Sequence, residues 1–144
     1  MKAIVSTTRV YHFCAGHRLF RADWSDERNW ETFGPCSYPE SHGHNYTLEV
    51  TVRGVPDADT GWVVPPTVVN HAVEEHVMAR FDHRNLNQRL RLEYGATPTT
   101  EILVMELWDN LVETIAPPAQ LYRLKISETS KNSFEYWGLQ DARL

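Results

Sequence analysis

The chain has 144 residues, of which 42% are hydrophobic and 23% are charged, a composition typical of one globular domain. Nineteen Asp and Glu against fourteen Lys and Arg give a net charge of −5, which argues against a general nucleic-acid or membrane-surface binder. Two cysteines are too few for a secreted disulfide framework, and no apolar run is long enough to span a membrane. We therefore expect one cytoplasmic domain over residues 1–144, without a signal peptide or internal repeats.

The N-terminal half predicts two strands separated by a short helix. β-Branched and aromatic residues are dense over 3–14, and apolar residues alternate with polar ones over 45–54, which is the period of a half-buried strand. Ser25 can cap a helix that ends near Gly34. Residues 54–66 are rich in turn formers and predict a loop.

The C-terminal half predicts two helices followed by a hairpin. Apolar residues four apart predict a helix over 67–81. A second helix opens with Thr97 as N-cap and Pro98 in its first turn, and two consecutive prolines end it. Alternation returns over 120–128 and 133–139. The order β-β-α-α-β-β favours an α+β domain with an antiparallel sheet that carries both helices on one face, and its free sheet edges favour oligomerisation.

Three histidines form the candidate metal site. His42 and His44 are two residues apart at the entry to the second strand, so both imidazoles can point to the same face and reach one ion. His17 follows the end of the first strand, the hairpin neighbour of the second. Three imidazoles without a fourth protein ligand are typical of a catalytic zinc site with an open position. The alternative is that all three are polar loop histidines, since a His-x-His pair often arises by chance.

A cysteine and an Asp-His pair are the candidate proton-transfer groups. Cys36 lies six residues before His42, where a nearby dication would favour the thiolate that a base or nucleophile requires. The alternative is a small buried hydrophobe, a role that Cys14 fits better inside its apolar strand. Asp82 and His83 follow the first long helix and can relay a proton if they fold back toward Cys36. The alternative for this pair is a turn-forming Asp beside a histidine at a helix C-terminus.

Other histidines and carboxylates do not form a site by pattern. His71 and His76 frame a sequence that resembles a zincin helix, but a spacing of five places them about 140° apart on an α-helix, so we expect a solvated face. His12 lies within the first strand, where we expect a core or interface residue. On pattern alone, Glu101 and Glu128 are surface residues.

Seven short segments carry a resemblance that covers nearly the whole chain in order. They are FCAGHRL (13–19), FGPC (33–36), HGHNY (42–46), TGWV (60–63), FDHRNLN (81–87), PTTE (98–101) and SET (127–129). Together they resemble the 6-pyruvoyltetrahydropterin synthase and 6-carboxytetrahydropterin synthase family. The resemblance implies the tunnelling fold, in which trimers close a barrel and two trimers stack into a hexamer with active sites at subunit interfaces.

The resemblance also implies the ligands and the residue roles. The substrate would be 7,8-dihydroneopterin triphosphate, with Mg²⁺ accompanying the triphosphate. Cys36 would remove a carbon-bound proton, with Asp82 and His83 as relay partners, and Glu128 would grip the pterin ring. Zinc would be held by His17, His42 and His44, and the pterin end would be lined by Thr99, Thr100 and Glu101.

The chain departs from the family pattern at one place, and its product is open between two branches. Pro65 and Pro66 stand where the family usually carries Asp or Asn and an apolar residue, which puts the entry to the first long helix in doubt. The five residues between Cys36 and His42 resemble the 6-pyruvoyl branch, which eliminates triphosphate. One alternative is the 6-carboxy branch of a deazapurine-type pathway, which releases acetaldehyde and triphosphate. Others are a non-catalytic pterin-binding or zinc-sequestering module and a structural oligomer without metal.

Overall fold

A computed structural model describes residues 2–139. Its elements are β1 (Val5–His17), α1 (Asp26–Phe33), the 3₁₀ turn η1 (Gly34–Ser37), β2 (His42–Gly54), α2 (Pro66–Val73), the π turn η2 (Glu74–Met78), α3 (Ala79–Phe81), β3 (Arg84–Asn85), α4 (Leu86–Arg89), α5 (Thr100–Leu111), the 3₁₀ turn η3 (Val112–Thr114), β4 (Gln120–Ser127) and β5 (Ser133–Tyr136). The predicted α+β class and the order of the main elements are therefore confirmed.

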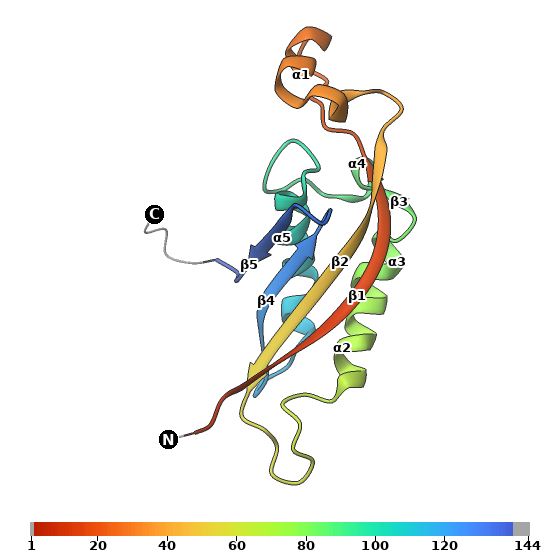
Figure 1. The fold of residues 1–144 in the computed structure, drawn as a ribbon. Helices are drawn as coiled ribbons and strands as arrows, with labels where there is room; N and C mark the ends of the chain where they lie inside the picture. Colours follow the sequence, from red (N-terminus) through yellow and green to blue (C-terminus); the bar gives the residue numbers. More distant parts are fainter. Residues whose placement is uncertain (1, 140–144) are drawn as a thin grey trace.

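The strands form one five-stranded sheet in the order β3-β1-β2-β4-β5 (Figure 1). β1 and β2 pair antiparallel over their whole length, from Val5 opposite Gly54 to His17 opposite His42. β4 and β5 extend the sheet, also antiparallel. The expectation of a purely antiparallel sheet was wrong at one edge, because β3 pairs parallel with β1. β3 has only two residues, which is too short for a periodic pattern in the sequence to predict it.

The long helices cover one face of the sheet, as predicted (Figure 1). Alternate strand residues such as Phe13, Tyr46 and Leu48 are buried there against Leu103 and Leu107 of α5. Burying each leucine side chain contributes roughly 1.5–3 kcal/mol, so this layer fixes α5 on the sheet. The α1 hairpin extends beyond one end of β1 and β2, where Ser25 caps α1 by accepting from the Arg28 amide, as predicted.

The β1–β2 hairpin is longer than predicted, and this changes the setting of the histidines. His17 is the last residue of β1, and His42 and His44 lie within β2 instead of a loop before it. The hydrogen-bonded pairing runs without a register shift through this end of the hairpin. The alternation of a strand therefore fixes the directions of all three side chains.

The two long helices begin at different residues from those predicted. α2 begins at Pro66, which occupies the first turn, where a missing N–H costs nothing. The prolines therefore start the helix and do not disrupt its entry. α5 begins at Thr100 with Thr99 as its N-cap, so the prediction of Thr97 as N-cap was wrong. The amide of Thr99 instead donates to the Thr97 carbonyl in a turn before the helix.

A π turn interrupts the helix predicted over 67–81. It spans Glu74–Met78 between α2 and α3, so the angle worked out for an ideal α-helix does not hold for His71 and His76. Both Nε2 atoms approach Oε2 of Glu75, at 3.3 Å and 3.9 Å. The side chain of His71 is 81% exposed, so the interpretation of a solvated helix face stands.

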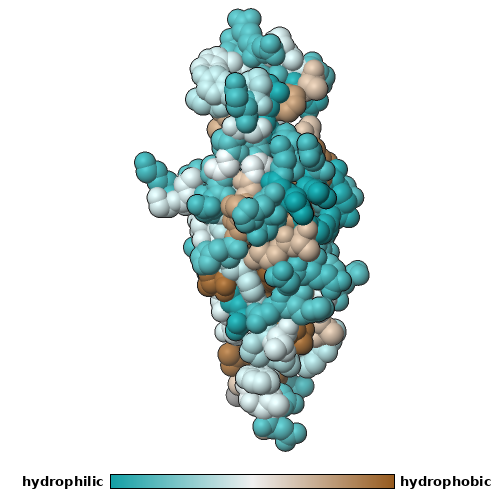
Figure 2. Space-filling view, turned by 90° about the vertical axis from the view of Figure 1, so that its right-hand side faces the viewer, coloured by the Kyte–Doolittle hydropathy of each residue, from teal (hydrophilic) through white to brown (hydrophobic). Residues whose placement is uncertain are grey.

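The sheet face away from the helices is polar. His12 is exposed on it, and its Nδ1 lies 3.3 Å from Oγ1 of Thr47, so His12 is not a core residue of the chain, and the other predicted possibility, an interface residue, stays a prediction. Figure 2 shows another side of the molecule, the one on which α2, α3 and β3 lie in Figure 1, and this surface is largely hydrophilic with separate apolar patches. Within residues 2–139, none of the helices combines the length and the apolar character needed to cross a bilayer.

Candidate metal and pterin site

The structure brings the three predicted metal ligands together at one end of the β1–β2 hairpin. The ring centroids of His17 and His42 are 4.5 Å apart, those of His42 and His44 5.0 Å, and those of His17 and His44 5.2 Å. One ring nitrogen from each residue lies within 4.8 Å of the other two, so small side-chain adjustments suffice for all three to bind one ion. The strand register explains this, because His17 faces His42 across the hairpin and His44 is two residues further along.

His17 shows that this cluster fits a metal ion. Its ring is buried, and its Nδ1–H donates to the carbonyl of Pro98 at 2.8 Å, which leaves Nε2 with the free lone pair. That Nε2 atom is buried and has no hydrogen-bond partner among residues 2–139. A buried polar nitrogen without a partner costs free energy, and binding of a cation removes that cost. A carbonyl on the other ring nitrogen is also the usual support of a zinc-bound histidine.

The protonation state of the three imidazoles suits a metal. Burial lowers the pKa of His17, of His42 and of His44 below the usual histidine value. Neighbouring imidazoles act in the same direction, while the carboxylate of Glu128 partly offsets them. All three rings are therefore neutral at neutral pH, the form that binds a metal ion.

A carboxylate from the C-terminal hairpin stands beside the histidines. Glu128, directly after β4, has Oε1 at 3.6 Å from Nε2 of His44 and at 3.9 Å from Nε2 of His17. Oγ1 of Thr100, buried at the start of α5, donates to the same oxygen at 2.6 Å. The side chain of Glu128 is only 14% exposed, so the expectation of a surface residue from pattern alone was wrong. Thr99 is half-buried beside Thr100.

Glu101, predicted to line the pterin end, and Cys36, predicted to remove the proton, lie in different environments. Glu101 is exposed in the first turn of α5. Cys36 is half-buried in η1, and its carbonyl accepts from the amide of Leu19 at 2.8 Å. The Arg18 Nε donates to the neighbouring carbonyl of Ser37 at 2.8 Å. These bonds hold η1 against the segment that directly follows His17.

The sequence predicts that Asp82 and His83 fold back toward Cys36. In the described part of one chain, ligand atoms of Asp82, His83 and Cys14 lie within 4.8 Å of one another, and the relay with Cys36 stays a prediction. Cys14 is half-buried, so the interpretation as a buried hydrophobe overlooked a thiol beside an acid and an imidazole. The signal was the alternation of β1, which puts Cys14 on the face opposite His17. The parallel pairing of β3 with β1 then brings Asp82 and His83, which directly precede β3, next to Cys14.

Comparison with known proteins identifies the family. A profile described as 6-pyruvoyl tetrahydropterin synthase matches residues 6–139. The chain belongs to this family. It is 43% identical over 131 residues to the 6-pyruvoyl tetrahydrobiopterin synthase of Drosophila melanogaster, a match that covers 91% of this chain and 78% of the relative. The human enzyme of the same name is 38% identical, with 91% and 90% covered.

A solved structure of the same family has the same fold, and a relative of the 6-carboxy branch also matches part of the chain. The solved 6-pyruvoyl tetrahydropterin synthase of Caenorhabditis elegans superposes with a TM-score of 0.87 at 35% identity, covering 96% of this chain and 98% of that one. The fold is therefore the tunnelling fold predicted from the resemblance. The 6-carboxy-5,6,7,8-tetrahydropterin synthase of Bacillus subtilis is 33% identical over 84 residues, which is 56% of this chain and 53% of that relative.

Proposed function

We propose that the protein is a zinc-dependent lyase of tetrahydropterin synthesis that converts 7,8-dihydroneopterin triphosphate to 6-pyruvoyltetrahydropterin and releases triphosphate. The observation that carries this proposal is the neutral three-histidine cluster with the Glu128 carboxylate beside it, in a chain of this family. The 6-pyruvoyl relatives match about nine tenths of the chain, whereas the 6-carboxy relative matches 56% of it. That difference favours the 6-pyruvoyl branch.

His17, His42 and His44 would hold the zinc, with the orphaned Nε2 of His17 as one donor. A bound zinc makes the side-chain hydroxyls of the substrate and the adjacent C–H bonds more acidic. The three imidazole donors are neutral, so they would not cancel the charge of the metal, and the Glu128 carboxylate beside them would act as a nearby counter-charge. The 2.8 Å bond from Nδ1 of His17 to the Pro98 carbonyl keeps this ring in the required tautomer.

Glu128 would bind the pterin ring. A carboxylate accepts two parallel hydrogen bonds from a ring N–H and an exocyclic amino group. Thr100 fixes the rotation of this carboxylate through its 2.6 Å hydrogen bond, so the ring is held at a set distance from the histidines. Thr99, half-buried beside Thr100, would line the pterin end, and we keep the same prediction for exposed Glu101.

Cys36 would remove the carbon-bound proton, with Asp82 and His83 as relay partners from a second copy of the chain. Within one chain the Asp-His pair lies beside Cys14, so a relay with Cys36 requires a subunit interface. This supports the proposal of a homohexamer built as two trimers with sites between subunits. Residues 1–144 as one domain and a cytoplasmic location remain predictions, and so does Mg²⁺ bound with the triphosphate.

A mass-resolved product assay on zinc-loaded protein with 7,8-dihydroneopterin triphosphate tests the proposal. The expected result is a 6-pyruvoyl product with free triphosphate. Acetaldehyde with a 6-carboxy product would place the chain in the other branch. Bound pterin without any product would instead indicate a binding module.

A further inference from the structure

The polar face of β1 carries a second cluster of metal-ligating side chains. Phe13, Ala15 and His17 are buried under the helices, whereas Cys14 is half-buried on the opposite face. β3 pairs with β1 along the edge of the sheet, with Ala15 opposite Arg84. The residues that precede β3 therefore arrive directly beside the thiol.

The main chain of Cys14 holds Asp82 and His83 in place. The Cys14 amide donates to Oδ1 of Asp82 at 3.0 Å, and the His83 amide donates to the Cys14 carbonyl at 2.7 Å. The second bond is made although His83 has φ of 57°, a left-handed conformation that is uncommon for a residue other than glycine. Nδ1 of His83 lies 3.0 Å from Oδ1 of Asp82. The three side chains are thus kept together by backbone bonds that do not involve the thiol or the imidazole.

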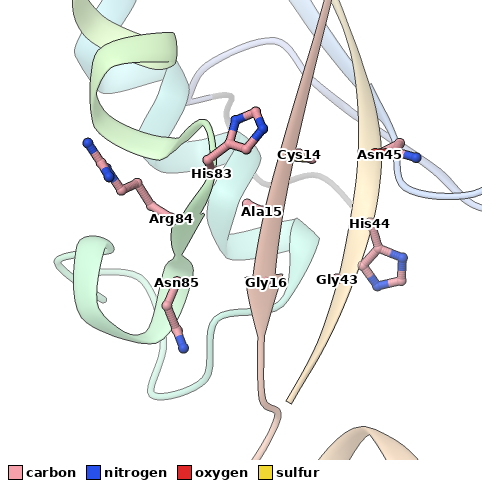
Figure 3. A pocket seen from close by; sticks show the side chains of 9 residues that line it. All are labelled: Cys14, Ala15, Gly16, Gly43, His44, Asn45, His83, Arg84 and Asn85. Atoms are coloured by element: carbon pink, nitrogen blue, oxygen red, sulfur yellow. The ribbon is translucent and has the colours of Figure 1, made fainter. Parts of the chain in front are cut away.

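The cluster opens into a cavity of about 450 Å³ (Figure 3). Cys14 and His83 line it, together with Asn45, Asn85 and His44, and Figure 3 shows the His44 imidazole turned away from Cys14. In the single chain the side chain of His83 is 77% exposed and that of Asp82 is 34% exposed, so their own chain does not cover either donor. Arg84 also lines the cavity, and Figure 3 shows its guanidinium extending away from Cys14. An ion at the thiol would therefore not lie against that positive charge.

We propose that Cys14, Asp82 and His83 form a second metal site, separate from the three histidines, for a thiophilic divalent cation of the zinc class. The donor atoms lie within 4.8 Å of one another and comprise one sulfur, one oxygen and one nitrogen. This mixture suits tetrahedral zinc with a fourth position for water. On binding, the S–H bond of Cys14 breaks, its proton goes to solvent, and the thiolate sulfur, a carboxylate oxygen and a neutral imidazole nitrogen each donate an electron pair to the ion.

Occupation of this site has a consequence for turnover, and that consequence rests on the proposed function. An ion held by Asp82 and His83 removes the lone pairs that the pair would use to move a proton. Excess Zn²⁺ therefore inhibits the enzyme, and Cys14→Ser relieves the inhibition while leaving turnover at stoichiometric zinc unchanged.

Cobalt substitution tests the site without any assay of activity. Protein loaded with Co²⁺ should bind two ions per chain and show the thiolate-to-cobalt charge-transfer absorption that histidine ligands alone do not give. Cys14→Ser should lose that absorption and one ion, while the matched Cys36→Ser should keep both. Absence of the absorption in the wild type, or its loss in Cys36→Ser alone, would overturn the proposal.

A second variant tests the same site in case Cys14→Ser does not fold. His83→Asn removes the imidazole, and Asn tolerates the left-handed backbone. His83→Asn should lose the ion at the Cys14 site together with its thiolate absorption. His42→Ala should lose only the ion at the three-histidine site and keep the thiolate absorption. Retention of two ions in His83→Asn would contradict the site. A wild type that turns over no pterin would refute the proposed function and leave the cobalt result intact.

Discussion

Replacement of Thr100 by valine removes the hydrogen bond that orients the proposed pterin carboxylate. Valine has nearly the same shape, and the threonine side chain is buried, so the change leaves no cavity. The lost bond is 2.6 Å long and ends on a carboxylate, a type of bond that contributes roughly 1.5–3 kcal/mol. Glu128 keeps 14% exposure and can regain water, so we expect the lower part of this range, about 1.5–2 kcal/mol in the free energy of unfolding.

Thermal unfolding and pterin titration measure this effect. For a chain of this size, Thr100→Val should lower Tm by roughly 3–8 °C. It should also weaken pterin binding, because the carboxylate is free to turn toward His44, 3.6 Å away. The matched control for the melting measurement is Thr99→Val, since the Thr99 side chain makes no capping hydrogen bond to α5. If Thr100→Val melts and binds like the wild type, or Thr99→Val lowers Tm by the same amount, the assigned role of the Thr100–Glu128 bond is wrong.

Three further predictions concern the metal, pH and the base. Protein purified without added zinc should contain about one zinc per chain, and His42→Ala should lose it while exposed His71→Ala keeps it. Because burial lowers the pKa of His17 in the folded state, below about pH 6.5 the unfolded chain binds a proton that the folded metal-free chain does not. Unfolding of metal-free protein should thus become easier as pH falls, by about 1.4 kcal/mol per pH unit for this group, and a flat denaturation profile would contradict this. Cys36→Ala should abolish turnover while calorimetry shows zinc and pterin still bound, and unchanged turnover would remove Cys36 from the mechanism.

The features predicted well from the sequence are those that depend on local periodicity. His42 and His44 are two residues apart, and a strand sends such residues to the same face whatever the rest of the fold does. The alternation over the first and second strands was clear enough to predict their hairpin, and the hairpin supplied His17. Ser25 was equally predictable, because its side chain caps a helix that begins at the next residue.

The features that were missed depend on contacts between distant parts of the chain. The bond from Cys14 to Asp82 joins residues 68 apart, and the bond from His17 to Pro98 joins residues 81 apart. Pairing of the two-residue strand β3 sets the first of these contacts, and no periodic pattern marks so short a strand. Glu128 gave no local sign of burial, because its environment comes from β2 and α5, which lie earlier in the chain.

The two clusters on β1 differ in the charge they would leave on a bound ion, and this separates their roles. Three neutral imidazoles would not themselves reduce the charge of a dication, which would then polarise a substrate hydroxyl, with the Glu128 carboxylate nearby but outside the three donors. A thiolate and a carboxylate, as at Cys14 and Asp82, would offset that charge, so an ion there would polarise a bound hydroxyl less strongly than one held by three imidazoles. The alternation of β1 puts His17, of the proposed activating site, on the helix-covered face and Cys14, of the proposed second site, on the opposite face. The proposal therefore predicts inhibition by excess zinc through occupation of Asp82 and His83, and Cys14→Ser should be resistant to it.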